Sequence, residues 1–464
     1  FDRTVKDLKL KRFSFGDAIP AECLAVRREK EIDLGGGNLK PDVLSEKLAG
    51  DLAPEENSRI YYASCELLRT LAPGRYKGEI AFSDAAGRIV SYPVRLRVRG
   101  FVLPEKPPTL SLVSYDPQMA ASSWSLPPEK IAAALKSVCS RYGLYPIRAV
   151  PLPRHLDSYQ VALEPEWSEL GDRYGFVFAG AMPWIEWFPR FYLPNPKRKY
   201  PTMAAYFDHL IEGYRVAAGE LRKVGRLGEG YAYYDEIGIG QEEIRNILES
   251  MKKQTGLKLI TCFDKPFEGT AYLDYYKDLV DFFIFNNSYF VNPDMGKAIR
   301  NLRQSGRKVG WYFNVSAPAC PTTFNVIDVS GAAQRLHYYK IYQYGVDATL
   351  FWGLQHFGGL DMSSEPWKAS MRGNGFLVYP EEGKVIPSLR LELLREGIED
   401  LAHLRLAEQL AKARPDHPAA KKIAELLKLE WSGDITQGGD IPPERIRRFR
   451  AELDDAIETL WKER

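Results

Sequence analysis

The amino-acid sequence predicts an α/β protein: a (β/α)8 barrel, preceded by an antiparallel β-sandwich and followed by extra C-terminal helices. Three observations support this prediction. Period-2 alternation marks the end of the first hundred residues, eight short apolar runs alternate with amphipathic segments over the next 280 or so, and helical periodicity prevails beyond residue 391. Eight strand–helix units in a segment of that size fit a (β/α)8 barrel.

The N-terminal segment, residues 1–105, is predicted to be a β-sandwich. Over residues 89–99, valines and leucines alternate with arginines 95, 97 and 99, which is typical of a strand with one face buried. Residues 84–87 form a plausible hairpin turn to a strand at 75–83, and Pro93 indicates an edge position or a bulge. The proline-rich residues 103–108 then form a stiff linker. We expect this segment to be structural and to pack against the barrel.

The barrel is predicted over residues 106–412. Nearly continuous apolar runs between helices indicate a parallel sheet with both faces covered. The predicted strands are 109–115, 145–152, 174–179, 230–235, 258–264, 281–286, 308–315 and 347–352, and the helices between them include 128–141, 204–224, 241–255 and 334–344. An open doubly wound sheet is the alternative, but neither GxGxxG nor GxxxxGK[ST] follows any of these strands.

The C-terminal region is predicted to be helical. A helix over residues 391–413 would complete the eighth strand–helix unit, and helices over 419–427 and 443–461 would form an extension spanning 413–464.

Composition excludes several classes of function. Lys and Arg total 63 against 61 Asp and Glu, so the net charge of +2 gives no bulk field for a nucleic-acid partner. No apolar stretch reaches the roughly 18 residues of a membrane span. Five scattered cysteines, and six histidines without HxH or HExxH, indicate neither a disulfide framework nor a zinc site, so we expect no metal and no cofactor. Because the sequence begins with Phe1, we expect a processed chain; its compartment, cytoplasmic or exported, and its oligomeric state stay open.

Asp235 and Glu236 are the candidate catalytic pair, because they close the fourth predicted strand and active sites of barrels lie at the carboxyl ends of strands. Two adjacent carboxylates raise each other's pKa, which suits a general acid beside an ionised partner. Neighbouring residues on an extended strand point in opposite directions, so the two acids can address different atoms of one substrate. The structural alternative is that Asp235 caps the next helix and Glu236 is a solvated loop charge.

Aromatic and amide side chains follow other predicted strands at the same end. Trp352, followed by glycines, suits stacking against a sugar ring, although a lone Trp is more often a core residue. Aromatics, amides and two acids, without phosphate loops or metal ligands, are typical of sites for neutral polyols, and a glycan or glycoconjugate is the substrate that we expect. The candidate substrate-binding residues are Tyr234, Asn286, Trp311, Tyr312, Asn314, Trp352 and His356.

Four stretches together resemble glycoside hydrolase family 123 and the uncharacterised proteins that share its catalytic barrel. The stretches are 234–236, then 311–328, then 344–353, and finally 365–400, which contains Gly-Asn-Gly-Phe-Leu-Val-Tyr-Pro at 373–380 and Pro-Ser-Leu-Arg at 387–390. The resemblance extends over roughly residues 75–410. This sequence departs from the family's pattern at 317–325 and by Asn374 in place of an Asp.

The resemblance implies a retaining exo-β-N-acetylgalactosaminidase that acts by substrate assistance, an exception to the usual scheme with a carboxylate nucleophile. Glu236 would be the general acid and Asp235 would orient the 2-acetamido group of the substrate, with Tyr312 holding the acetamido oxygen. Two alternatives stay open: a glycosidase on the same barrel for a sugar without an acetamido group, and a non-catalytic glycan-binding protein.

Overall fold

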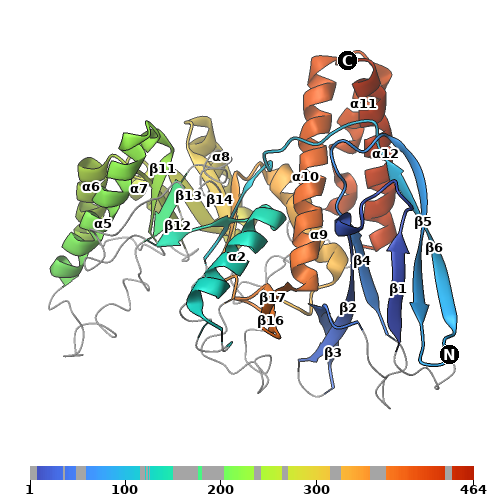
Figure 1. Ribbon diagram of the computed structural model, residues 1–464. Coiled ribbons are helices and arrows are strands. Elements are labelled where there is room, and N and C mark those ends of the chain that lie inside the picture. Colours follow the sequence, from blue (N-terminus) through green and yellow to red (C-terminus); the bar gives the residue numbers. More distant parts are fainter. Residues whose placement is uncertain are drawn as a thin grey trace.

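We analysed a computed structural model of the 464-residue chain. It describes residues 8–34, 37–48, 59–114, 121, 124, 126–149, 176–179, 203–234, 242–263, 270–313, 326–355, 373–433 and 441–464. Figure 1 shows a large α/β part beside antiparallel β-strands and long C-terminal helices.

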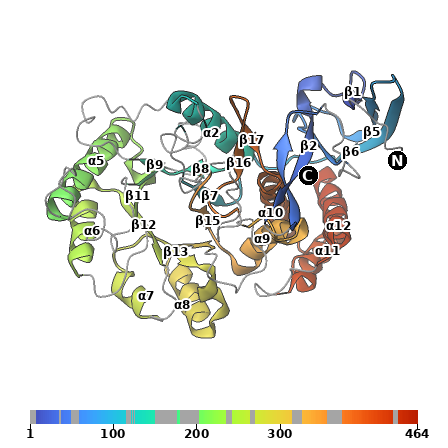
Figure 2. The same cartoon turned by 90° about the horizontal axis from the view of Figure 1, so that it is seen from below.

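A curled parallel sheet forms the centre of the α/β part, and helices surround it (Figure 2). Its strands are β7 (Leu110–Val113), β8 (Tyr145–Pro146), β9 (Arg148–Ala149), β10 (Phe176–Ala179), β11 (Gly230–Tyr234), β12 (Lys258–Phe263), β13 (Phe282–Asn286), β14 (Lys308–Tyr312) and β15 (Ala348–Phe351). The order in the sheet is β8-β7-β15-β14-β13-β12-β11-β10-β9. Each predicted strand run therefore contains an observed strand.

The sheet is open, which corrects the prediction of a closed (β/α)8 barrel. Among the described residues, seven strands of four to six residues pair continuously, and the two-residue strands β8 and β9 lie at the two ends. β8 pairs with β7 and β9 pairs with β10, but no ladder joins β8 to β9. These two strands are consecutive in the chain with Ile147 between them, so the sheet curls until its ends approach without forming an eighth full strand.

Side chains of the parallel strands alternate between two cores, as expected for strands covered on both faces. The inner core lies within the curl and comes almost wholly from alternate strand residues. It comprises Leu110, Leu112, Tyr145, Ile147, Val177, Tyr231, Tyr233, Ile260, Cys262, Phe282, Ile284, Tyr312, Ala348 and Leu350. The residues between them join the helices in a larger outer core. Adjacent residues of one strand therefore have different surroundings, which matters for the site below.

Apart from two helices at 271–276 and 293–304, which the sequence analysis did not predict, the described helices agree closely with the prediction. They are α2 (Pro128–Tyr142), α5 (Met203–Lys223), α6 (Glu242–Thr255), α7 (Ala271–Tyr276), α8 (Pro293–Gln304), α9 (Gly331–Tyr344), α10 (Leu389–Ala413), α11 (Pro418–Leu426) and α12 (Pro443–Lys462). Gly143 and Gly345 end α2 and α9 in the left-handed conformation, with φ of 67° and 62°. Glycine tolerates this conformation because it lacks a Cβ.

The N-terminal segment is antiparallel β, as predicted, but it forms two separate three-stranded sheets, and the predicted sandwich is not confirmed. One sheet has the order β1-β5-β6 and the other β3-β2-β4. The strands are β1 (Lys9–Ser14), β2 (Leu24–Asp33), β3 (Leu39–Ser45), β4 (Tyr61–Cys65), β5 (Gly74–Ser83) and β6 (Ile89–Val98). The predicted hairpin joins β5 and β6, and Pro93 lies in β6 at the edge of its sheet.

Two buried ion pairs join the β3-β2-β4 sheet to α10. The guanidinium of Arg27 lies 3.0 Å from Glu392, whose Oε1 also accepts a hydrogen bond from Tyr142 at 2.6 Å. Arg390 pairs with Asp42 at 2.9 Å, and their side chains are 1% and 0% exposed. Removing one partner of such a pair leaves a buried charge uncompensated, at a cost of about 3–5 kcal/mol. The N-terminal sheet is thus bound tightly to the part of the chain that follows the parallel strands.

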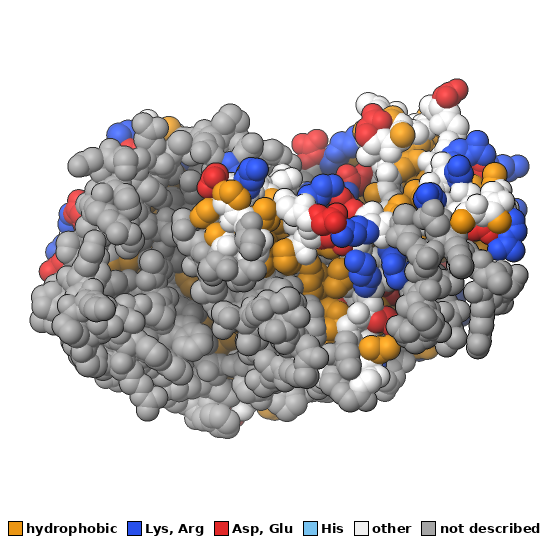
Figure 3. All heavy atoms as spheres, turned by 60° about the horizontal axis from the view of Figure 1, so that its bottom comes forward, with side chains coloured by type: hydrophobic (Ala, Val, Ile, Leu, Met, Phe, Trp, Pro, Cys, Tyr) orange, Lys and Arg blue, Asp and Glu red, His pale blue; other side chains and the backbone are white. Residues whose placement is uncertain are grey.

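A small hairpin and the C-terminal helices complete the fold. Strands β16 (Val378–Glu381) and β17 (Lys384–Pro387) pair just before α10, and α11 and α12 pack beside α10. The predicted domain boundaries near residues 105 and 412 stay a prediction. Over the described part of the face in Figure 3, acidic and basic side chains are interspersed, in keeping with the net charge of +2.

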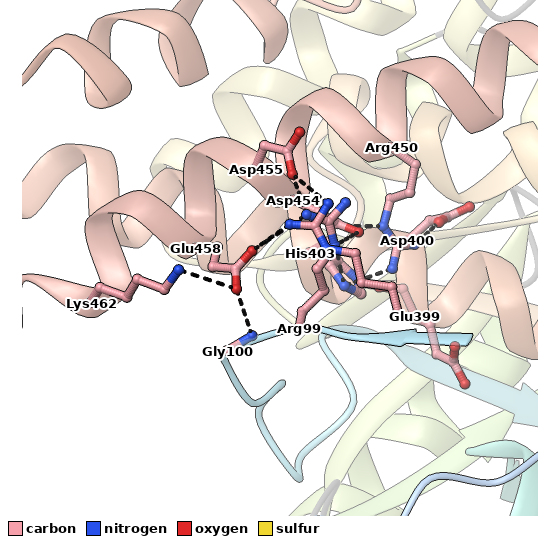
Figure 4. A network of polar contacts seen from close by, with 11 residues as sticks. Arg99, Gly100, Glu399, Asp400, His403, Arg450, Asp454, Asp455, Glu458 and Lys462 are labelled. Atoms are coloured by element: carbon pink, nitrogen blue, oxygen red, sulfur yellow. Dashed lines mark hydrogen bonds and ion pairs between the residues drawn. The ribbon is translucent and has the colours of Figure 1, made fainter. Parts of the chain in front are cut away.

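A buried polar network joins α10 to α12 (Figure 4). Arg450 of α12 contacts Asp400 and donates a hydrogen bond to His403 Nε2 at 2.6 Å. The Nδ1 of His403 is 2.8 Å from the carbonyl oxygen of Glu399, to which it donates. The imidazole therefore uses one nitrogen as donor and the other as acceptor, which is the neutral form. Burial and the neighbouring charge of Arg450 lower the pKa of His403 to about 3.

This network predicts a pH-dependent stability. The pKa of His403 is about 6.5 in the unfolded chain and about 3 in the folded chain. Between these two values protons bind the unfolded chain more readily, so the free energy of unfolding decreases as the pH falls below 6.5. Between pH 7 and pH 5 this one group should lower the free energy of unfolding by about 2 kcal/mol. Urea titrations of wild type and His403→Gln measure it: the variant should lose less stability over that interval. Equal losses would contradict the assignment.

Candidate active site

The carboxyl edge of the parallel sheet, where β11 to β15 end, is the place at which the sequence predicts a site. Asp235, Glu236, Asn314 and His356 lie outside the described residues. Asp235 and Glu236 directly follow Tyr234, the last residue of β11. The described part of this edge contains Asn286, Tyr312 and Trp352, the residues that end or follow β13, β14 and β15.

Asn286 and Tyr312 lie side by side. They are partners in the parallel ladder between β13 and β14, and both are nearly buried, with 3% and 7% of their surfaces exposed. Tyr312 belongs to the inner core, and ladder partners share a face, so Asn286 also faces the inside of the curl. The Oδ1 of Asn286 accepts a hydrogen bond from the backbone of Ser288 at 3.1 Å, which fixes the amide where the chain turns away from the sheet. The two side chains form one polar pair at the inner carboxyl edge.

Trp352 follows β15 directly and is only partly buried. Its indole Nε1 donates a hydrogen bond of 2.8 Å to Oδ1 of Asn374, a residue that is itself 5% exposed. The backbone beyond it continues into a bridge between Gln355 and Phe376. Asn374 was not among the predicted site residues, because nothing in its local sequence indicates that it orients a strand-end Trp.

Tyr234 and Trp311 occupy different surroundings. Both belong to the outer core, between the sheet and its helices, and Trp311 is 0% exposed. The indole of Trp311 makes ring contacts with Phe290 and His337 at centroid distances of 5.2 and 5.6 Å. These are packing contacts, so the structure does not bring Trp311 together with Tyr312, its neighbour in sequence. That either residue binds substrate stays a prediction, and we leave both out of the proposed site.

The described residues contain no group of three or more His, Cys, Asp or Glu side chains arranged to hold a metal ion. Among the described helices, none is both long and apolar enough to cross a membrane.

Comparison with known proteins relates part of the chain to one family. Residues 241–407, 167 of the 464 residues, match the family model described as glycoside hydrolase 123, catalytic domain. This match supports a glycosidase activity in general, with a glycan as substrate. The matched segment contains Asn286, Tyr312 and Trp352 and begins five residues after Glu236.

Solved structures support the same fold. A family 123 glycoside hydrolase from Clostridium perfringens, studied for glycolipid glycan hydrolysis, aligns with a TM-score of 0.63 and 16% identity over 98% of this chain and 88% of that chain. At so low an identity, the similarity shows that the two proteins share a fold and says nothing about the substrate of this one.

Two further structures align less well. A family 39 glycoside hydrolase from Bacteroides cellulosilyticus has a TM-score of 0.40 at 11% identity, covering 86% of this chain and 81% of that one. A β-glucuronidase from Ruminococcus gnavus has a TM-score of 0.34 at 11% identity, covering 85% and 68%. Scores this low support no conclusion. A search of curated proteins finds no match.

Proposed function

We propose that this protein is a retaining exo-β-N-acetylgalactosaminidase that uses the 2-acetamido group of its substrate as the nucleophile. The observation that carries the proposal is the place of Asp235 and Glu236 in the sequence, directly after Tyr234, the last residue of β11, and just before the segment that matches the family 123 catalytic domain. Carboxyl ends of parallel strands are where barrel-type enzymes place their reacting groups.

In the proposed first step, Glu236 gives its proton to the glycosidic oxygen as the bond to the anomeric carbon breaks. The carbonyl oxygen of the acetamido group forms a new bond to that carbon, while Asp235 accepts the N–H of the same group and stabilises the positive charge that develops there. The product of this step is an oxazoline-type ring together with the free aglycone alcohol.

In the second step, Glu236, now a carboxylate, takes a proton from water, and the water oxygen attacks the anomeric carbon as the ring opens. Two inversions leave the sugar with its original β configuration, and Glu236 is protonated again. Water, which attacks in the second step, is the one co-reactant, and neither step needs a metal or an oxidant to balance.

The described residues supply substrate contacts in this proposal. Tyr312 would donate its hydroxyl to the acetamido oxygen, Asn286 would hydrogen-bond a sugar hydroxyl, and Trp352 would pack against the apolar face of the ring. Asn286 and Tyr312 adjoin each other across β13 and β14, so their two polar groups can address one sugar.

A panel of aryl glycosides tests the proposal. Aryl β-N-acetylgalactosaminide should be cleaved with release of the β-anomer, seen by NMR before mutarotation, and a thiazoline mimic of the oxazoline should inhibit. Glycolipid glycans belong in the panel because the Clostridium perfringens relative was studied on them. Cleavage only of glycosides without the 2-acetamido group, with no thiazoline inhibition, would replace this mechanism with that of another glycosidase; binding without any cleavage would indicate a glycan-binding protein.

Replacing Tyr312 with Phe is expected to lower kcat about tenfold on the acetamido substrate, because the variant loses one hydrogen bond that strengthens in the transition state. Steady-state kinetics measures it. Tyr231→Phe is the matched control, because Tyr231 belongs to the same inner core but is the second residue of β11, at the opposite end of the strand from the carboxyl edge. Equal kinetics in both variants would remove Tyr312 from the mechanism.

A further inference from the structure

We propose that Asp42, Tyr379 and Arg390 are positioning residues of the active site: they fix the backbone of residues 373–376, which in turn hold the indole of Trp352. The proposal rests on the proposed function, because it makes Trp352 a substrate contact. It assigns the β3-β2-β4 sheet, which lies outside the parallel sheet, a part in substrate binding.

The first link is the pair between Asp42 of β3 and Arg390 in the first turn of α10. Arg390 donates from Nε to Oδ1 at 2.9 Å and from Nη2 to Oδ2 at 3.0 Å, so the pair is bidentate. The hydroxyl of Tyr379 donates to the same carboxylate. All three side chains are almost wholly buried. Bidentate geometry fixes the plane of the guanidinium, which a single contact would leave free to turn.

The second link runs from the same guanidinium to the backbone of the 373–376 segment. Nη1 of Arg390 donates to the carbonyl oxygen of Gly373, and Nη2 donates to that of Phe376, each at 2.8 Å. The guanidinium also lies over the ring of Phe376, 5.2 Å from its centroid. One planar group thus holds both ends of a four-residue segment, and the Asp42 side chain determines where that group lies.

The segment is tightly enclosed at Gly373. A Cβ there would lie 2.6 Å from Ile327 and 3.0 Å from the guanidinium carbon of Arg390, and φ is +94°. Only glycine suits such a position, which lets the carbonyl approach the guanidinium closely.

The third link is the hydrogen bond of 2.8 Å from Trp352 Nε1 to Asn374 Oδ1. Asn374 lies between the two carbonyls that Arg390 holds. A shift of the segment would therefore move the acceptor of the indole. Because Trp352 is only partly buried, this hydrogen bond is one of the constraints on its ring plane, and stacking on a sugar depends on that plane.

A merely structural role is the alternative, because buried ion pairs often contribute only to packing. The molecule offers a matched control. Arg27 and Glu392 form a second buried pair between the same N-terminal sheet and α10, and Glu392 contacts Tyr142 and Arg395 rather than the 373–376 segment. A variant at Arg27 should perturb the same interface without moving the Trp352 acceptor.

The experiment compares Asp42→Asn, Tyr379→Phe and Arg390→Lys with Arg27→Lys, in the full-length protein. We expect the first three to raise KM for aryl β-N-acetylgalactosaminide about three- to tenfold while kcat changes less than about twofold, as for loss of an interaction equal in ground and transition states. Arg27→Lys should leave both constants within that twofold limit. Acrylamide quenching of the Trp352 fluorescence, taken as the difference from Trp352→Phe in each background, should increase only in the first three variants.

Asn374 provides a second set of variants that does not disturb the buried charges. Asn374→Leu should raise KM and the quenching of Trp352, as Arg390→Lys does. Asn374→Asp keeps an acceptor for the indole, so its KM and quenching should stay close to those of the wild type. If Arg390→Lys fails to fold, the Tyr379 and Asn374 variants decide the matter.

The outcomes separate this proposal from the proposed function. If wild type cleaves the substrate and the Asp42, Tyr379 and Asn374→Leu variants match Arg27→Lys in KM and quenching, the positioning role is wrong and the function stands. If wild type cleaves no acetamido glycoside but quenching of Trp352 increases in the same variants, the function is wrong while the coupling from Asp42 to Trp352 stands.

Discussion

Glu236→Gln is expected to lower kcat/KM by about 10²–10⁴ on an aryl β-N-acetylgalactosaminide with a poor leaving group, because the amide cannot give a proton to the departing oxygen. The loss should shrink when the aglycone is a dinitrophenolate, which leaves without protonation. The measurement is a series of substrates that differ only in the acidity of the aglycone, with rates plotted against its pKa.

The slope of that plot is the decisive quantity. In the wild type Glu236 protonates the leaving oxygen, so the rate depends only weakly on the pKa of the aglycone and the slope is shallow. In the variant no proton is donated, so the rate depends strongly on the pKa of the aglycone and the slope is steep. Circular dichroism on both proteins controls for folding. Wild-type rates on the poor leaving groups would refute the role of Glu236, and a uniform loss across the series would indicate that Glu236 acts on some other step.

Asp235→Asn is expected to lower kcat by about 10²–10³ on substrates with the 2-acetamido group, the usual cost of removing one preorganised electrostatic partner of a transition state. The asparagine keeps the shape of the side chain but not the charge that stabilises the developing oxazolinium. Affinity for a thiazoline inhibitor should fall in parallel, because that molecule resembles the intermediate.

The control for this variant is the dependence of its rate on the pKa of the aglycone. This dependence should match that of the wild type, because Glu236 is unchanged. A variant that keeps the wild-type kcat and thiazoline affinity would leave Asp235 without the proposed role. A loss in which the acetamido group makes no difference would favour a conventional carboxylate nucleophile or base.

Much of the parallel sheet could be predicted from the sequence, because strands buried on both faces read as short apolar runs between amphipathic helices. Because both faces of such a strand are apolar, the sequence does not indicate which side chains face the inside of the sheet and which face the helices. Trp311 and Tyr312 stand next to each other in one such run, and both were predicted to bind substrate. The structure places Trp311 among the helices and Tyr312 in the inner core, a difference of phase that an unbroken apolar run does not encode.

The links between distant segments could not be predicted at all. Asp42 in a strand reads as an exposed charge, since its partner Arg390 is 348 residues away and no local pattern joins them. The strands before residue 74 escaped prediction for the same reason: charged residues such as Arg27 and Asp42 interrupt the apolar alternation, yet both are buried. Closure of the barrel was overestimated because the described part of the apolar run at 145–152, residues 145–149, forms the two short strands β8 and β9 in place of one full strand.

The pairs that join the N-terminal sheet to α10 also bear on how the chain is made. Arg27 and Asp42 leave the ribosome long before their partners, which are 365 and 348 residues further along. At about 5–20 residues per second, the early sheet waits roughly 20–70 s for the residues that neutralise it. During synthesis Arg27 and Asp42 therefore lack the partners that neutralise them in the folded protein until α10 has emerged, although the strands of their sheet are already present.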